Sequence, residues 1–125
     1  MEPQKFSITQ RIKSFKYAFE GYKYLFKEEH NARVHLFFTI LVVSCGFFFQ
    51  INLLEWVSIF FAIGLVIVTE ILNTAIEKLA DFVSPNKNIN IKIIKDLAAA
   101  AVFTSTIIAV IIGVIIFLPK LTQIL

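Results

Sequence analysis

The chain has 125 residues, of which 58% are hydrophobic and 17% charged, with a formal net charge of +3. Soluble domains contain roughly 45–50% apolar residues, so this composition argues against a water-soluble fold. Charged residues are absent from long stretches of the sequence, which is typical of a chain whose apolar segments cross a membrane. The single cysteine, Cys45, lies inside an apolar run and excludes an intrachain disulfide.

The first predicted element is an amphipathic helix over about residues 6–28. Its apolar side chains recur at three- and four-residue intervals, and lysines largely occupy the other faces. The apolar positions are Ile8, Ile12, Phe15, Phe19, Tyr22 and Phe26. This pattern predicts a helix on the cytoplasmic membrane surface or a helix that packs its apolar stripe on the membrane spans, and the two can hold together.

Three membrane spans are predicted after this helix, over about 34–51, 54–80 and 91–118. The first span, and residues 97–118 of the third, are apolar runs of the roughly 20 residues that one crossing needs. The middle run is shorter, so we expect its crossing to carry Glu70 and Asn73 to or just below the hydrocarbon boundary. The sequence therefore predicts an all-α membrane protein with a single domain, residues 1–125.

The third span carries small residues at strict four-residue spacing, which predicts a face for close helix packing. They are Ala101, Ser105, Ala109 and Gly113. Basic residues predict the orientation, because they precede the first span or lie around the second connection, and the first connection has none. By the positive-inside rule, we expect the N-terminus and the 81–95 connection in the cytoplasm.

A polar stripe at the cytoplasmic end of the middle span is the first candidate for chemistry. Glu70, Asn73, Glu77 and Asp81 are spaced so that they fall within roughly 80° of one another around a helix. Glu77 and Asp81 alone would fit a solvated helix end equally well. An acid as deep as Glu70 is costly in a membrane and usually has a function.

Two other segments bring ionisable groups to the same depth. Glu29 lies at the start of the first span, and Lys95 and Asp96 lie at the start of the third. Paired carboxylates suit Mg²⁺, which shares its coordination shell with substrate phosphates, and a lysine complements those phosphates. A deep carboxylate can accept a proton from a lipid hydroxyl. The pattern therefore indicates phosphoryl transfer to a lipid.

Other kinds of site are not supported by the sequence. Dispersed glycines exclude a Walker-type loop and a soluble kinase fold. The four glycines are Gly21, Gly46, Gly64 and Gly113. His30 and His35 are expected as interfacial polar residues and not as zinc ligands, because no Cys/His cluster surrounds them.

The stretch Glu70-Ile-Leu-Asn73-Thr-Ala-Ile-Glu77-Lys-Leu-Ala-Asp81 resembles the signature of the small bacterial integral-membrane diacylglycerol kinases, which include the undecaprenol kinases. Lys95-Asp96 followed by small residues continues the resemblance, which runs from Phe15-Lys16-Tyr17-Ala18 through the third span. The resemblance implies that Glu70 is the general base. It also implies that Glu29 and Glu77 are the metal-linked carboxylates that hold MgATP, and that Lys95 and Asp96 contact the nucleotide.

The resemblance implies several further contacts. Asn73 matches a polar position beside the base, and Tyr17 matches an aromatic residue on the nucleotide side. The turn Asn86-Lys87-Asn88 is expected to lie near the nucleotide. Asn31-x-Arg33-x-His35 resembles the Gram-positive branch, whose members favour undecaprenol over diacylglycerol, so Asn31 and Arg33 are expected to bind the lipid substrate.

The family resemblance also implies the assembly and the activity. The implied fold is a homotrimer with a surface helix and three spans per subunit, in which neighbouring subunits share the sites. The implied enzyme transfers the γ-phosphoryl group of ATP to a membrane lipid alcohol, either undecaprenol or diacylglycerol, with Mg²⁺ as its cofactor. Its expected location is the cytoplasmic (inner) membrane, its expected partners are MgATP and the lipid, and no nucleic acid is expected.

Two other classes of function remain as alternatives. A small proton-coupled transporter typically has one membrane-embedded glutamate, and a non-catalytic assembly subunit would use a polar stripe to bind partner helices. The acids of this chain continue to the predicted cytoplasmic surface and meet a lysine, and only three spans are predicted. These features favour the kinase over the transporter.

Overall fold

The structure is a computed structural model that describes residues 5–125, so residues 1–4 of the expected 1–125 domain lie outside the described residues. Within residues 5–125 the chain forms four α-helices. They are α1 (Ile8–Glu28), α2 (His30–Phe48), α3 (Leu53–Val83) and α4 (Ile89–Ile124). The all-α class expected from the sequence is confirmed.

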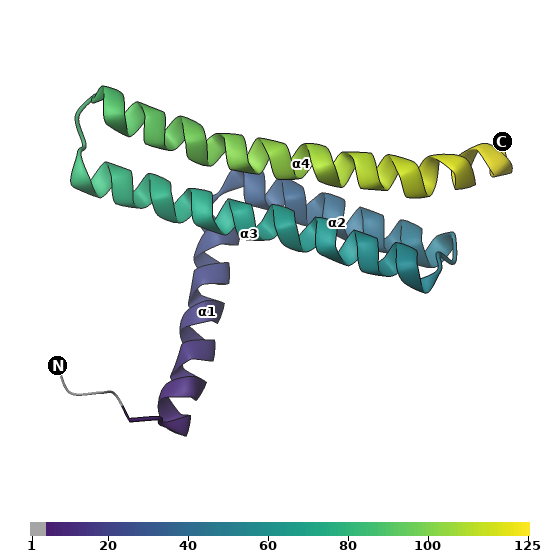
Figure 1. Cartoon of the computed structure of the whole chain (residues 1–125). Coiled ribbons are helices and arrows are strands. Elements are labelled where there is room, and N and C mark those ends of the chain that lie inside the picture. The colour runs from purple at the N-terminus through teal and green to yellow at the C-terminus, as the bar shows by residue number, and fades with distance from the viewer. Residues whose placement is uncertain (1–4) are drawn as a thin grey trace.

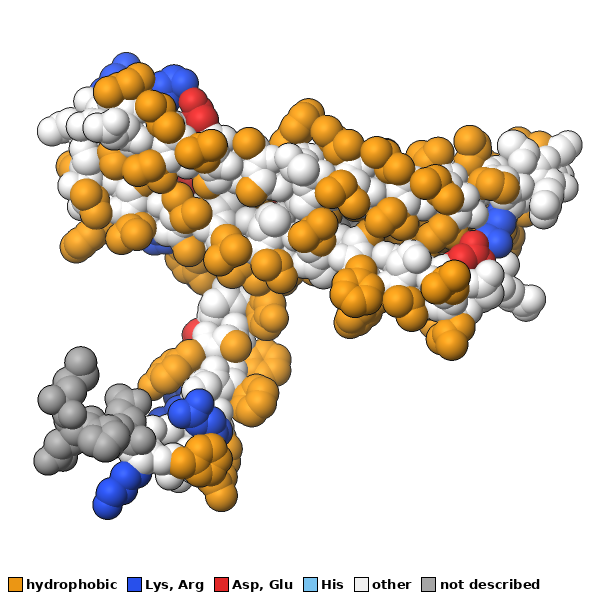
Figure 2. All heavy atoms as spheres, viewed as in Figure 1, with side chains coloured by type: hydrophobic (Ala, Val, Ile, Leu, Met, Phe, Trp, Pro, Cys, Tyr) orange, Lys and Arg blue, Asp and Glu red, His pale blue; other side chains and the backbone are white. Residues whose placement is uncertain are grey.

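Three of these helices, α2, α3 and α4, are long and apolar enough to cross a membrane. At 1.5 Å per residue, the 31 residues of α3 and the 36 residues of α4 extend about 46 and 54 Å, beyond the roughly 30 Å hydrocarbon core. Many of their large apolar side chains are exposed in the single chain, and Figure 2 shows them along the bundle. Such a surface fits lipid or neighbouring helices better than water. The chain is therefore a multi-pass membrane protein.

The three apolar helices lie side by side, and α1 leaves the bundle at a steep angle (Figure 1). Helix α3 packs closely along α4, and α2 contacts α3. Ser105 of the small-residue face is buried, but Ala101 is exposed and Ala98 is buried instead. The packing face of α4 therefore differs from the strict four-residue stripe, because a straight α-helix turns slightly more than a full circle every four residues.

A tight turn joins α2 to α3. The amide of Ile51 donates to the carbonyl of Gly46 over 3.2 Å, and Gln50 between them has a φ of 50°. This is the Schellman arrangement, in which one left-handed residue closes the helix end. Gly46 lies so close to the indole of Trp56 that a Cβ added there would be 2.6 Å from its Cη2 atom. The small residue thus lets the two helices approach.

A capping box begins α3 at the same turn. The side chain of Asn52 accepts from the amide of Glu55 over 2.9 Å, and Glu55 Oε1 accepts from the amide of Asn52 over 3.1 Å. These reciprocal bonds satisfy two amides that the helix itself cannot pair. Glu55 Oε1 also lies 3.3 Å from Lys120 Nζ near the end of α4. Glu55 therefore stabilises the start of α3 and also pairs with the neighbouring helix α4.

Charged pairs between α3 and α4 occur at both ends of the bundle. Glu55 and Lys120 form one pair, and Asp81 and Lys95 form the other beside the α3–α4 connection. Figure 2 shows acidic and basic side chains gathered at these two ends, with mainly apolar side chains between them. This distribution matches a bundle whose middle is in hydrocarbon and whose ends reach the interfaces.

Helix α1 is attached to the bundle near its C-terminus. Leu25 is its buried residue, and Lys78 Nζ of α3 donates to the hydroxyl of Tyr24 over 2.7 Å. The apolar residues Ile8, Ile12 and Phe15 near its N-terminus are exposed in the single chain. Most of the apolar stripe of α1 is therefore not packed on the spans of its own chain.

Candidate active site

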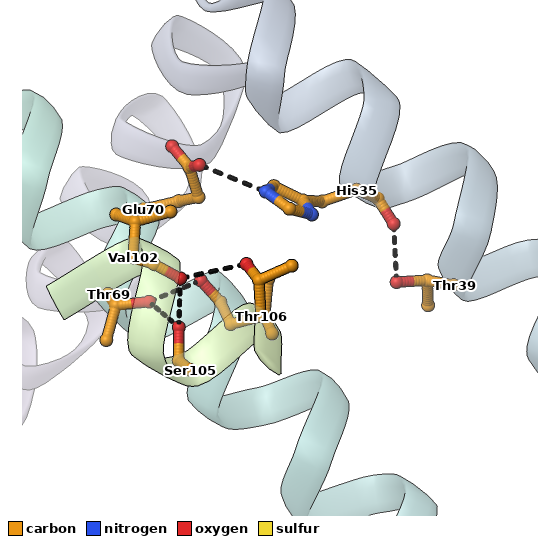
Figure 3. Close-up of polar contacts among 8 residues, drawn as sticks. His35, Thr39, Thr69, Glu70, Val102, Ser105 and Thr106 are labelled. Atoms are coloured by element: carbon orange, nitrogen blue, oxygen red, sulfur yellow. Dashed lines mark hydrogen bonds and ion pairs between the residues drawn. The ribbon is translucent and has the colours of Figure 1, made fainter. Parts of the chain in front are cut away.

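Glu70 is the buried acid of the apolar bundle. Only 3% of the Glu70 surface is exposed, and the residue lies about 20 Å from the C-terminal end of α3. Its Oε1 atom lies 3.1 Å from Nε2 of His35 on α2, and Figure 3 shows the two side chains facing each other. A buried carboxylate needs such a partner, because removing its charge from water is costly.

Further polar side chains lie around Glu70. Thr69 Oγ1 and Ser105 Oγ are 2.7 Å apart and join α3 to α4 on one side (Figure 3). On the next turn of α3, Asn73 Oδ1 and Thr74 Oγ1 are buried, and neither has a hydrogen-bond partner within residues 5–125. Unpaired buried polar atoms are rare in folded proteins and often mark functional positions. Asn73 thus lies one turn from Glu70 and has a buried oxygen that is unpaired in the described chain.

Glu29 and Glu77 lie near Glu70. Glu29 is the extended residue, with φ −105° and ψ 113°, that separates α1 from α2, and its side chain does not cap α2. Glu77 lies two turns beyond Glu70 on α3. Both residues are half-buried. We refer to Glu29, Glu70 and Glu77, which come from the α1–α2 junction and from α3, as the acidic cluster.

The donor set of this cluster fits Mg²⁺ that is shared with a phosphate. Among the described residues, no three His, Cys, Asp or Glu side chains form a complete metal site. Mg²⁺ does not need one, because it is commonly held by one or two carboxylates together with water and substrate phosphates. Neither the Glu29 nor the Glu77 carboxylate forms a hydrogen bond or an ion pair within residues 5–125, so both are available as ligands of this kind.

A cavity of about 650 Å³, lined in part by charged and amide side chains, lies at the α3–α4 connection. The charged residues that line it are Asp81, Lys87, Lys92, Lys95 and Asp96, and Asn86 and Asn88 line it as well. Lys95 pairs with Asp81, and Lys92 Nζ lies 2.6 Å from Asp96 Oδ2. Three lysines against two aspartates leave an excess of positive charge, which suits a polyphosphate ligand.

Five residues predicted on the nucleotide side are thus brought together by the structure, namely Asn86, Lys87, Asn88, Lys95 and Asp96. Tyr17, Asn31 and Arg33 are not part of this group. All three are exposed, and none lines this cavity. Their predicted contacts with nucleotide or lipid remain predictions.

The sequence did not identify His35 as a partner of Glu70. It was expected at the interface, but its side chain is only 20% exposed and lies in the contact between α2 and α3. Ala32 and Gly46 on the same helix are buried, and Thr39 and Val42 are half-buried. Apolar residues occur on all sides of α2, so its sequence did not indicate which face meets α3. Asp81 and Lys92 were likewise missed as cavity residues.

Comparisons with known proteins identify the family of this chain. Residues 16–117 match the model of the prokaryotic diacylglycerol kinase family. The undecaprenol kinase of Bacillus subtilis is 39% identical over 114 residues, which cover 91% of this chain and 93% of that protein. The diacylglycerol kinase of Haemophilus influenzae is 29% identical over 88% of this chain and 94% of that protein.

A diacylglycerol kinase of Synechocystis is 34% identical over 90% of this chain, which spans 65% of that longer protein. These relatives favour neither of the alternative classes, the transporter and the assembly subunit. The family model and the identity to the Bacillus subtilis protein extend over nearly the whole chain and include the acidic cluster and the cavity. The chain therefore belongs to the prokaryotic diacylglycerol kinase family.

Proposed function

We propose that this lipid kinase transfers the γ-phosphoryl group of ATP to the hydroxyl of a membrane lipid, with Glu70 as the general base. The observation that carries the proposal is the order of groups along α3. Glu70 lies deep in the bundle, Glu77 lies two turns nearer its end, and Asp81 lines the lysine-rich cavity one turn further. A lipid acceptor, a metal-bound triphosphate and a nucleotide would meet these groups in the same order.

A second cavity supports a lipid acceptor. It has a volume of about 370 Å³ and lies between α2, α3 and α4. Apolar residues form most of its lining, and the polar side chains among them are His35, Thr39 and Thr106. Because His35 also contacts Glu70, a hydrocarbon chain in this cavity would bring its polar end close to the carboxylate.

In the proposed reaction, the lipid hydroxyl oxygen attacks the γ-phosphorus, and the bond from that phosphorus to the β–γ bridging oxygen breaks. ADP leaves, and Glu70 accepts the hydroxyl proton. Lys95 and its neighbours in the cavity hold the negative phosphates. Glu29 and Glu77 would hold Mg²⁺, which would supply positive charge to neutralise the phosphates.

We propose that the cavity end of the bundle faces the cytoplasm of a cell whose inner membrane holds the protein. Supporting this, basic residues precede α2 and surround the α3–α4 connection, whereas the α2–α3 turn has none. Helix α1, with its exposed apolar and basic side chains, would then lie on the cytoplasmic surface. Its steep angle to the spans supports that placement (Figure 1).

We also propose that the protein is a homotrimer with sites shared between subunits. The single chain supports this because its two predicted sites are open and much of its apolar surface is uncovered. Neighbouring subunits would cover part of that surface. Cross-linking in native membranes, resolved by mass, tests the proposal: trimeric products are expected, and products no larger than monomer would contradict it.

Undecaprenol is the proposed acceptor ahead of diacylglycerol. The name and the 39% identity of the Bacillus subtilis relative support it, as does the motif Asn31-x-Arg33-x-His35. Purified protein in mixed micelles should transfer label from the γ-position of ATP to undecaprenol with a larger kcat/KM than to diacylglycerol. A larger kcat/KM for diacylglycerol would reverse the assignment, and label in neither lipid would contradict the kinase proposal.

The variant Glu70→Gln tests the general base. Proton acceptance typically contributes about 10²–10⁴-fold, so turnover should fall by at least about a hundredfold while MgATP binding stays close to that of the parent. If Glu70 only held α2 against α3, the glutamine would preserve a hydrogen bond and turnover together. Glu20→Gln, exposed on α1, is the control and should keep parental turnover.

A further inference from the structure

The contact between His35 and Glu70 joins two helices that otherwise approach each other over a limited region. His35 lies on the face of α2 that meets α3, and its Nε2 atom is 3.1 Å from Glu70 Oε1 (Figure 3). The side chains are 20% and 4% exposed, respectively. The contact is therefore largely removed from water. A polar interaction is stronger in such an environment, so it has a larger effect on geometry there.

The contact leaves one oxygen of the carboxylate free. Within residues 5–125, His35 is the side chain that pairs with Glu70, and it pairs through Oε1. Glu70 Oε2 has no such partner there. The imidazole therefore contacts the carboxylate at Oε1, where it orients the group, and leaves Oε2 to accept a proton from a substrate hydroxyl.

The backbone around His35 is part of a helix that lies against its neighbours. Thr39 Oγ1 donates to the carbonyl of His35 over 2.8 Å, and Ala32, one turn before His35, is 2% exposed. The small side chain of Ala32 allows α2 to lie close to its neighbours at this level. His35 thus approaches Glu70 from a packed helix and not from a mobile loop, as a group that orients a base requires.

We propose that His35 is the positioning residue of the general base, which it holds in the orientation needed for proton transfer. This inference rests on the proposed role of Glu70. The competing explanation is that the pair only stabilises the α2–α3 contact. Orientation of a base affects turnover, whereas a purely structural pair affects the unfolding temperature.

Three single variants separate these explanations. His35→Leu removes the contact, and His35→Gln retains an N–H at about the position of Nε2. His30→Leu is the matched control, because His30 is exposed on the first turn of the same helix. Each protein is measured in mixed micelles for kcat, for KM of MgATP and for unfolding temperature, with the lipid that the parent phosphorylates.

His35→Leu should lower kcat by about 10- to 100-fold, a typical effect of losing a group that orients a reactive residue, and change KM for MgATP less than twofold. His35→Gln should recover at least a third of parental kcat, and His30→Leu should match the parent. A His35→Leu protein that unfolds at a lower temperature but keeps parental kcat would overturn the proposal. So would a His35→Gln protein as slow as His35→Leu.

The double variant Glu70→Gln/His35→Leu distinguishes failure of this inference from failure of the base assignment. If His35 acts through Glu70, the double variant should be no slower than Glu70→Gln alone, because groups that act as a unit are non-additive. A further loss of tenfold or more would overturn the inference. Parental turnover in Glu70→Gln would remove the base role itself, and the positioning role with it.

Discussion

Lys95 of α4 forms an ion pair with Asp81 of α3 at the edge of the lysine-rich cavity. Their side chains are 36% and 65% exposed, so the pair itself contributes little stability. Its effect is to hold a lysine ammonium at the cavity, within one turn of Glu77 along α3. The ion pair thereby holds the positive charge of Lys95 at the cavity, where the proposed nucleotide would bind.

Lys95→Met keeps the length of the side chain and removes its charge. A charge-assisted hydrogen bond contributes about 1.5–3 kcal/mol, so KM for MgATP should rise roughly ten- to a hundredfold. Initial rates at saturating lipid measure it. Lys120→Met is the control, since Lys120 pairs with Glu55 at the opposite end of the bundle. Equal effects of the two substitutions would show that the cavity does not hold the phosphates.

Glu77→Gln keeps the shape of a proposed metal ligand and removes its charge. The Mg²⁺ concentration that gives half-maximal velocity should rise at least about tenfold, because Mg²⁺ prefers charged oxygen ligands. A titration of Mg²⁺ at fixed ATP measures this value. Glu20→Gln on the exposed side of α1 should leave it unchanged. An unaltered Mg²⁺ requirement in Glu77→Gln would contradict the assignment.

Tyr24→Phe tests how α1 is attached to the bundle. It removes the hydroxyl that accepts from Lys78 and leaves the ring, whose centroid is 4.9 Å from the ammonium. Exposed charged contacts contribute about 0.2–1 kcal/mol, so trypsin should cleave after Lys27 up to about fivefold faster. Tyr22→Phe is the control, because Tyr22 has no such contact in the described chain. Equal cleavage of both variants would exclude this contact as the attachment.

Gly46→Ala tests the close approach of α2 and α3. The added Cβ would lie 2.6 Å from Trp56 Cη2, so the indole must move, and overpacking of this kind typically costs about 1–3 kcal/mol. Thermal unfolding in detergent, followed by Trp56 fluorescence, measures the loss. Gly64→Ala, with open space around its Cβ, should be neutral or stabilising by up to about 1 kcal/mol. Similar unfolding temperatures for the two variants would show that the turn tolerates the methyl group.

The sequence predicted the helical class and the acidic stripe because both depend on local patterns. Hydropathy identified the three apolar helices, and helical periodicity placed Glu70 and Glu77 on one face. The contact of His35 with Glu70 was not predictable in this way, because it depends on how α2 rotates against α3. Likewise, Asp81 and Lys95 occur in different helices, and only the folded connection brings them together.

The two ion pairs at the ends of the bundle, Glu55 with Lys120 and Asp81 with Lys95, have a consequence for the surrounding lipid. Along α3 they are separated by about 39 Å, close to the roughly 40–45 Å of a bilayer with its headgroup regions. A bundle with both ends anchored in this way has a fixed hydrophobic length. In a thinner or thicker bilayer, tilt or local lipid deformation must absorb the mismatch, and the depth of Glu70 relative to the lipid hydroxyls changes with it. In the proposed mechanism, membrane thickness would then help to determine which lipid hydroxyl the carboxylate can reach.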